Sequence, residues 1–148
     1  MVDVIQLRIA APPLLNQASV LVAEDQPFIA LGLALAVEDA GGKVVGPAAS
    51  CEEALVLLAT GVVDAAILDV NLVDGDCSTV MEVLVGRGVP FIVHTAVDLP
   101  PALATRFSGL VVQIKPCPAA RLVAQLENML AEHGRVVGGA APASYDRP

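Results

Sequence analysis

Short apolar runs alternate with longer amphipathic segments through the central part of the chain. The apolar runs have the length of strands and occupy residues 19–23, 43–46, 62–68, 90–94 and 110–114. The segments that follow them have the length of helices and occupy residues 27–40, 51–60, 77–86, 98–107 and 118–133. Strands that alternate with helices over short connections are typical of a parallel sheet with helices on both faces. The pattern therefore predicts a doubly wound α/β fold with a five-stranded parallel sheet.

The predicted domain covers residues 18–133, and a shorter segment flanks it on each side. Residues 1–17 have no place in the alternation, so we expect an N-terminal arm that is either flexible or added to the sheet as a strand. Residues 134–148 are rich in Gly, Ala and Pro, and we expect a flexible C-terminal tail there. Inside the domain, Ser50 is placed to cap the second helix, and Gly41-Gly42 is placed to end the first.

Composition and charge exclude several classes of function. The chain of 148 residues is 55% hydrophobic but only 3% aromatic, so its core must consist mainly of aliphatic side chains. A formal net charge of −8 argues against binding to nucleic acid or to an anionic membrane surface. No run approaches the roughly 18 apolar residues needed to span a bilayer, and the N-terminus lacks the features of a secretory signal.

The cysteines point to a reducing compartment. Cys51, Cys77 and Cys117 are odd in number and far apart in sequence, and they form no C-x-x-C motif. This pattern favours free thiols over a disulfide framework or a metal site. We therefore expect a cytoplasmic protein.

Polar residues stand at the C-terminal ends of four predicted strands, and they carry the chemistry of the chain. Glu24 and Asp25 follow the first strand, Asp69 the third, Thr95 the fourth and Lys115 the fifth. In an open parallel sheet this edge is where ligands bind. Carboxylates, a hydroxyl and an ammonium that converge there predict a site for a divalent metal and a phosphoryl group.

In the order and placement of these residues, the chain resembles the receiver domain of bacterial two-component response regulators, over residues 18–133. The resemblance implies a flavodoxin-like (βα)5 receiver fold. It also implies that Asp69 accepts a phosphoryl group from phosphohistidine on a histidine kinase or histidine phosphotransfer protein. Thr95 and Lys115 would contact the phosphoryl group, with Val70 and Ala96 as further backbone donors. The Lys115–Pro116 bond would be cis.

The resemblance further implies a Mg²⁺ cofactor. Glu24, Asp25 and Asp69 would hold it together with the backbone carbonyl of Asn71, because Mg²⁺ prefers hard oxygen ligands. Without a cation, carboxylates this close would repel one another and raise each other's pKa.

Plainer interpretations exist for several of these residues. The Glu24-Asp25 pair could simply favour the start of the following helix, and Lys115 could be a surface lysine. Thr95 could be a strand-end hydroxyl whose hydrogen bonds are satisfied locally. We expect His94 to be a packed or hydrogen-bonded core residue.

Asp74 and Asp76 are expected to be loop and cap residues and not metal ligands.

The chain departs from the family at Val112, which stands where receivers usually carry an aromatic residue three positions before the lysine. An outward report of phosphorylation would therefore need another route.

The first predicted helix carries an outward apolar stripe. If Ile29, Leu33, Val37 and Ala40 face the core, then Phe28, Leu31 and Leu35 lie on the outer face. Such a stripe suits docking of the phosphodonor's helical bundle. The alternative is that residues 4–15 of the N-terminal arm cover it.

The sequence thus predicts a stand-alone receiver, an acceptor that can lose its phosphoryl group by hydrolysis and that signals through protein contacts. The main alternative is a degenerate receiver that binds proteins without phosphorylation. A phosphohydrolase is disfavoured because Asn71 stands where such enzymes carry a second aspartate. A flavin or nucleotide binder is disfavoured because no Gly-rich loop follows the first strand. Homodimer formation stays open.

Overall fold

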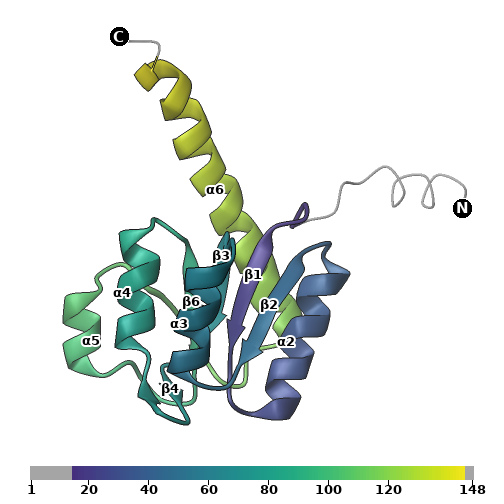
Figure 1. Ribbon diagram of the computed structural model, residues 1–148, viewed down its shortest axis with the longest axis vertical. Coiled ribbons are helices and arrows are strands. Elements are labelled where there is room, and N and C mark those ends of the chain that lie inside the picture. The colour runs from purple at the N-terminus through teal and green to yellow at the C-terminus, as the bar shows by residue number, and fades with distance from the viewer. Residues whose placement is uncertain (1–14, 146–148) are drawn as a thin grey trace, which may run out of the picture.

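The computed structural model describes the backbone of residues 15–145 and the side chains of residues 15–133. A five-stranded parallel sheet forms the centre, with the strand order β2-β1-β3-β6-β7 (Figure 1). Its strands are β1 (Ser19–Ala23), β2 (Lys43–Ala48), β3 (Ala65–Leu68), β6 (Phe91–Thr95) and β7 (Val111–Ile114). The helices are α2 (Pro27–Asp39), α3 (Cys51–Thr60), α4 (Ser78–Gly86), α5 (Pro101–Arg106) and α6 (Ala119–Tyr145). This topology confirms the predicted fold class.

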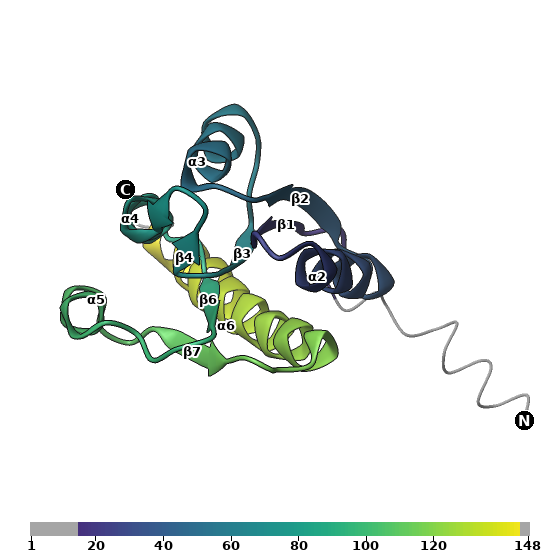
Figure 2. The same ribbon diagram turned by 90° about the horizontal axis from the view of Figure 1, so that it is seen from below.

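The sheet separates two layers of helices, and a core lies on each side of it. Helices α2 and α6 cover one face, whereas α3, α4 and α5 lie on the other (Figure 2). The central strand β3 is buried along its whole length, as its continuous apolar run predicts. Among the described residues, no helix is both long enough and apolar enough to cross a membrane.

Local sequence signals explain where two of the helices begin and end. The Ser50 hydroxyl accepts a hydrogen bond of 3.0 Å from the backbone N–H of Glu53, which confirms it as the cap of α3. Pro27 opens α2, where its missing N–H costs nothing. Gly41 adopts a φ of 85° just after that helix, a conformation that side chains with a Cβ rarely take, so the chain turns there.

The structure departs from the sequence pattern at both ends of the predicted domain. Helix α6 does not end near His133, because its backbone continues as helix to Tyr145 through the segment expected to be a flexible tail. The unfavourable step in helix formation is the first turn, and α6 has already formed that turn. The Ala-containing segment after His133 can therefore continue the helix even though it contains glycines. At the other end, Leu15 is 3% exposed and packs in the core between the sheet and α2. The packed domain thus begins before residue 18, while residues 1–14 of the predicted arm lie outside the described residues.

The segment after β3 contains a small hairpin that the sequence pattern did not predict. Strands β4 (Asn71–Leu72) and β5 (Gly75–Asp76) pair antiparallel there, and Cys77 donates a backbone hydrogen bond of 2.7 Å to the carbonyl of Val70. The hairpin lies at the lower edge of the molecule in Figure 1, which is the edge where the C-terminal ends of the strands meet.

Candidate functional site

Three carboxylates meet at the C-terminal edge of the sheet. Because β1 and β3 are parallel neighbours that pair Ala23 with Leu68, the residues directly after them also lie side by side. Carboxylate oxygens of Glu24, Asp25 and Asp69 all lie within 4.8 Å of one another. The structure therefore brings together the acids that the sequence placed at strand ends.

Lys115 completes this cluster from the far side of the sheet. It follows β7, and its side chain extends past the end of β6 to reach the carboxylates after β3 and β1. Its Nζ lies 2.8 Å from Asp69 Oδ2 and 2.9 Å from Glu24 Oε1. The Lys115 backbone N–H donates to the carbonyl of Thr95 at 2.7 Å, and the bond to Pro116 is cis, as predicted. An ammonium bridging two carboxylates contradicts the interpretation of Lys115 as an ordinary surface lysine.

The cluster is buried, and burial shapes its electrostatics. Glu24 is 3% exposed and Asp69 is 7% exposed. Burial raises the pKa of Glu24, while the hydrogen bond from Lys115 opposes that rise. Burial lowers the pKa of Lys115, but the hydrogen bonds and charges of Asp69 and Glu24 outweigh it, so the net pKa of Lys115 is raised. The ammonium is therefore held in its charged form between the two acids.

The donor set fits a hard divalent cation. It consists of carboxylate oxygens, the ligand type that Mg²⁺ prefers. Three carboxylates against one ammonium leave two negative charges, which a single divalent cation would cancel. Backbone donors hold two of the acids in place: the N–H of Gln26 donates to Glu24 Oε2, and the N–H of Asn71 donates to Asp69 Oδ1, each at 3.1 Å. Asn71 thus lies beside the cluster, and the ligand role of its carbonyl stays a prediction.

Thr95 lies at the end of β6 but does not join the cluster through its side chain. It is 1% exposed, and its Oγ1 accepts a long hydrogen bond of 3.4 Å from the backbone N–H of Val97. No hydrogen bond joins this hydroxyl to Asp69 in residues 15–133. The roles of Thr95 and of the Val70 and Ala96 backbone donors stay predictions.

His94 is a core residue, as predicted, but it is not hydrogen-bonded. It is 3% exposed, and neither of its ring nitrogens has a partner among the described residues. Burial lowers the pKa of His94, and the positive charge of Lys115 lowers it further against the opposing charge of Asp69. The imidazole also lines a hollow of about 220 Å³ between α2 and the segment that follows Lys115. An unpaired imidazole in such a place costs stability.

We expect His94→Leu to raise the free energy of unfolding by about 1 kcal/mol at pH 7, because an apolar side chain removes an unpaired buried polar group. The pKa of His94 is depressed in the folded state, so the free energy of unfolding of the wild type falls as the pH drops below the pKa of the unfolded state. The stability advantage of His94→Leu over the wild type should therefore grow as the pH is lowered from 7 to 5. Urea unfolding at both pH values measures it, and a variant less stable than wild type would show that the imidazole has a partner in solution.

The two loop acids that we expected to be caps are confirmed in that role. The Asp74 carboxylate accepts from the backbone N–H of Cys51 at 2.7 Å and of Glu52 at 3.1 Å. Asp76 accepts from the hydroxyl of Ser78 at 2.7 Å and from its backbone N–H at 3.0 Å. These hydrogen bonds lower the pKa of both acids, and neither acid belongs to the carboxylate cluster.

The outer face of α2 carries the predicted apolar stripe. Phe28 is 90% exposed, Leu31 55% and Leu35 50%, whereas Leu33 and Val37 on the opposite side of the helix are buried. We refer to Phe28, Leu31 and Leu35 as the α2 patch. It begins three residues after Asp25, and the helix that carries it lies in the same layer as the His94 hollow.

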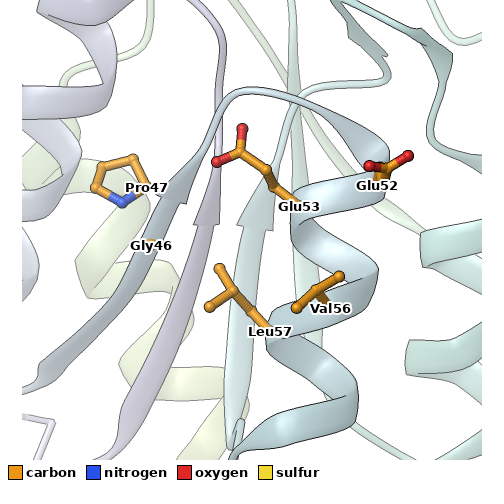
Figure 3. Close-up of a pocket in the computed structure, with 6 residues that line it drawn as sticks. All are labelled: Gly46, Pro47, Glu52, Glu53, Val56 and Leu57. Carbon is orange, nitrogen blue, oxygen red and sulfur yellow. The ribbon is translucent and has the colours of Figure 1, made fainter.

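A second hollow, of about 390 Å³, lies between β2 and α3 (Figure 3). Glu53 and Leu57 point from the helix toward the strand that carries Pro47. Its lining provides two carboxylates but no ammonium, hydroxyl or thiol. One of these, on Glu53, already accepts from the backbone N–H of Ala49 at 3.2 Å. This hollow therefore offers a phosphoryl group nothing comparable to the acidic cluster.

One pairing was missed by the sequence analysis. Cys51 and Cys77 are far apart along the chain, yet their sulfur atoms lie 3.2 Å apart, on the layer opposite to the α2 patch. The spacing of the cysteines alone could not have shown this, because it depends on how α3 and the hairpin pack.

Comparisons with known proteins assign the class. No protein-family profile matches the chain, and no curated protein sequence matches it either. Solved structures do match. SdrG from Sphingomonas melonis Fr1 is 33% identical, with a TM-score of 0.63, 77% of this chain covered and 96% of that chain covered. A putative response regulator from Chloroflexus aurantiacus J-10-fl is 30% identical, with a TM-score of 0.66 and coverages of 77% and 98%.

The response regulator PhyR from Brucella abortus is 29% identical with a TM-score of 0.64, over 81% of this chain. The present chain spans about half of PhyR, 51% of its length. The order of the strands in the sheet, the cluster of Glu24, Asp25 and Asp69, and the similarity to these solved structures all point to the same family. The chain belongs to the response regulator receiver family.

Proposed function

We propose that this receiver accepts a phosphoryl group on Asp69, in a reaction that depends on Mg²⁺, from phosphohistidine on a histidine kinase or histidine phosphotransfer protein. The contact of 2.8 Å between Asp69 Oδ2 and Lys115 Nζ, inside the acidic cluster, is the observation that carries the proposal. A degenerate receiver that only binds proteins would have no need to bury an ammonium against two acids. The proposal includes the cytoplasmic location expected from the sequence.

Each side chain has a task in the transfer. A carboxylate oxygen of Asp69 attacks phosphorus; a P–O bond forms while the P–N bond of the donor breaks, and its electron pair returns to the histidine ring. Lys115 already lies between Glu24 and Asp69, so its ammonium is in place for a phosphoryl oxygen. Within residues 15–133 the Thr95 Oγ1 only accepts a long hydrogen bond, from Val97, so its O–H group would be available to donate to the phosphoryl group.

Glu24, Asp25 and Asp69, with the backbone carbonyl of Asn71, would hold Mg²⁺. When bound, the cation supplies positive charge that offsets the charge of the transferred group. The protein serves as an acceptor and not as a turnover enzyme, with loss of the phosphoryl group by hydrolysis ending the signal.

The experiment that tests this function uses wild-type protein and a small phosphodonor. Incubation with acetyl phosphate and Mg²⁺ should add one phosphoryl group per chain to the intact mass, and hydroxylamine should remove it, as expected of an acyl phosphate. Addition of EDTA should prevent the increase. An unchanged mass with Mg²⁺ present would favour the degenerate receiver instead.

The α2 patch is the proposed docking surface for the phosphodonor. It is apolar and exposed, and it begins three residues after Asp25, so a helical partner seated on it would bring its phosphohistidine to the acidic edge. Val112 lacks the aromatic ring that receivers commonly use to report phosphorylation. Outward signalling therefore proceeds through protein contacts that do not depend on such a ring.

We expect Leu31→Lys to slow phosphotransfer about tenfold when the donor is a histidine kinase that phosphorylates the wild type. The variant would place a charge where the docked partner would otherwise bury an apolar side chain. Uptake from acetyl phosphate should stay unchanged, because that donor needs no docking surface. Val56→Lys is a matched control, because Leu31 and Val56 are both 55% exposed and Val56 lies on α3. Equal slowing in the two variants would remove the α2 patch as the docking surface.

A further inference from the structure

Cys51 and Cys77 form a close pair of thiols beside the segment that follows Asp69. Cys51 is the first residue of α3, and Cys77 directly precedes α4. Their sulfur atoms are 3.2 Å apart, which is less than the about 3.5–4.0 Å between touching carbon atoms. A disulfide needs about 2.05 Å, so a small rotation of the side chains would bring the sulfur atoms into bonding distance.

Neighbouring hydrogen bonds hold both cysteines in position. The carboxylate of Asp74 in the hairpin accepts from the backbone N–H of Cys51, which ties the hairpin to the start of α3. The Cys51 thiol lies 3.2 Å from the carbonyl oxygen of Asp76, to which it can donate. The backbone N–H of Cys77 closes the loop onto Val70. The approach of the two sulfur atoms is therefore fixed by the packing of α3 against the hairpin.

The two thiols differ in access to solvent. Cys77 is fully buried, whereas Cys51 is partly exposed, so a small oxidant in solution reaches Cys51 first. Burial raises the pKa of both thiols, and the carboxylates of Asp74 and Asp76 add to the rise at Cys51. Few thiolates exist at neutral pH, so oxidation is slow under mild conditions and the pair stays reduced until oxidant accumulates.

We propose that Cys51 and Cys77 are an oxidation site at which a hydroperoxide forms a disulfide that fixes the hairpin after Asp69 to α3. In the first step Cys51 sulfur attacks a peroxide oxygen; an S–O bond forms, the O–O bond breaks, and an alcohol or water leaves. In the second step Cys77 sulfur attacks Cys51 sulfur; the S–S bond forms, the S–O bond breaks, and water leaves. Two thiols are oxidised, one hydroperoxide is reduced, and the thiol protons end in the products. The bridge would enclose β3, Asp69 and the hairpin in one closed loop.

The test oxidises dilute full-length protein with hydrogen peroxide and counts thiols. We expect the count to fall from three to one, with a Cys51–Cys77 linked peptide in the non-reducing digest. The urea midpoint should rise by roughly 1 M, because the bridge constrains the unfolded chain, and a dithiol should reverse the shift. Amide hydrogen exchange of residues 70–77 should slow in the oxidised protein. None of these readouts requires phosphorylation, so they can succeed or fail separately from the proposed function.

Three variants make the result specific. Cys51→Ser should keep its remaining thiols reduced and show no midpoint shift. Cys77→Ala, which replaces a buried thiol with a small apolar side chain, should also keep its remaining thiols reduced and show no midpoint shift. Agreement between the two variants would show that the result does not come from a folding defect in one of them. Cys117→Ser should still lose two thiols, because Cys117 lies on the other face of the sheet. A linked peptide that contains Cys117, or oxidation of Cys51 to higher acids without linkage to Cys77, would overturn the proposal.

Discussion

In Asp69→Asn, acetyl phosphate and Mg²⁺ should add no phosphoryl group to the chain. The amide is a poor nucleophile, and the neighbouring acids cannot easily replace Asp69. Glu24 is the more buried of the two acids that contact Lys115, at 3% exposure against 7% for Asp69, so it is the less accessible acceptor. Intact-mass measurement over the time in which wild-type protein gains one phosphoryl group gives the result directly.

Asp98→Asn is the matched control for this experiment. Asp98 is an exposed acid in the loop after β6, near the same edge of the sheet, but it does not belong to the carboxylate cluster. This variant should be phosphorylated like the wild type. Phosphoryl uptake retained in Asp69→Asn would place the acceptor on another residue, with Asp25 the first candidate because it is the more exposed acid of the cluster.

Lys115→Met should lower the free energy of unfolding by about 3 kcal/mol at pH 8 in the presence of a chelator, because two buried carboxylates lose their counter-ion. The side chains of Glu24, Asp69 and Lys115 are each at most 9% exposed, so water cannot take over the role of the ammonium. Burial raises the pKa of Glu24 above its unfolded value, and loss of Lys115 raises it further. The penalty should therefore be small at low pH, where Glu24 is protonated, and grow as the pH rises through its folded pKa.

Lys43→Met is the control for this prediction, because Lys43 is exposed on the edge strand β2 and its loss should change stability by less than about 0.5 kcal/mol. Millimolar Mg²⁺ should restore more stability to Lys115→Met than to the wild type, since a cation that binds the folded cluster replaces the missing charge. Urea unfolding with and without Mg²⁺ measures both effects. Equal stability of Lys115→Met and wild type in chelator would mean that the acids are not ionised together.

Much of the fold could be predicted because its signals are local. The strands β1 and β3 are continuous apolar runs, and a run of that length between turn residues has few other interpretations. The acidic edge could be predicted for a related reason. Once strands are parallel, the residues after neighbouring strands must meet, so Glu24 and Asp69 follow from topology alone.

The features that were missed depend on contacts between distant segments. Strands of two residues, such as β4 and β5, are too short to show a period. The approach of Cys51 to Cys77 requires the packing of a hairpin against a helix that lies earlier in the chain. The lack of partners for His94 is likewise a property of the finished core, because most buried imidazoles do find one.

The division of the helices between two faces has a consequence for how inputs combine. A partner seated on α2 would cover one side of the molecule, while Cys51 is partly exposed on the other side of the sheet. Occupation of one therefore leaves the other accessible. A phosphodonor could be bound on α2 while peroxide oxidises Cys51 on the other side of the sheet. The segment around Asp69 would then respond to both phosphorylation and oxidation in the same molecule.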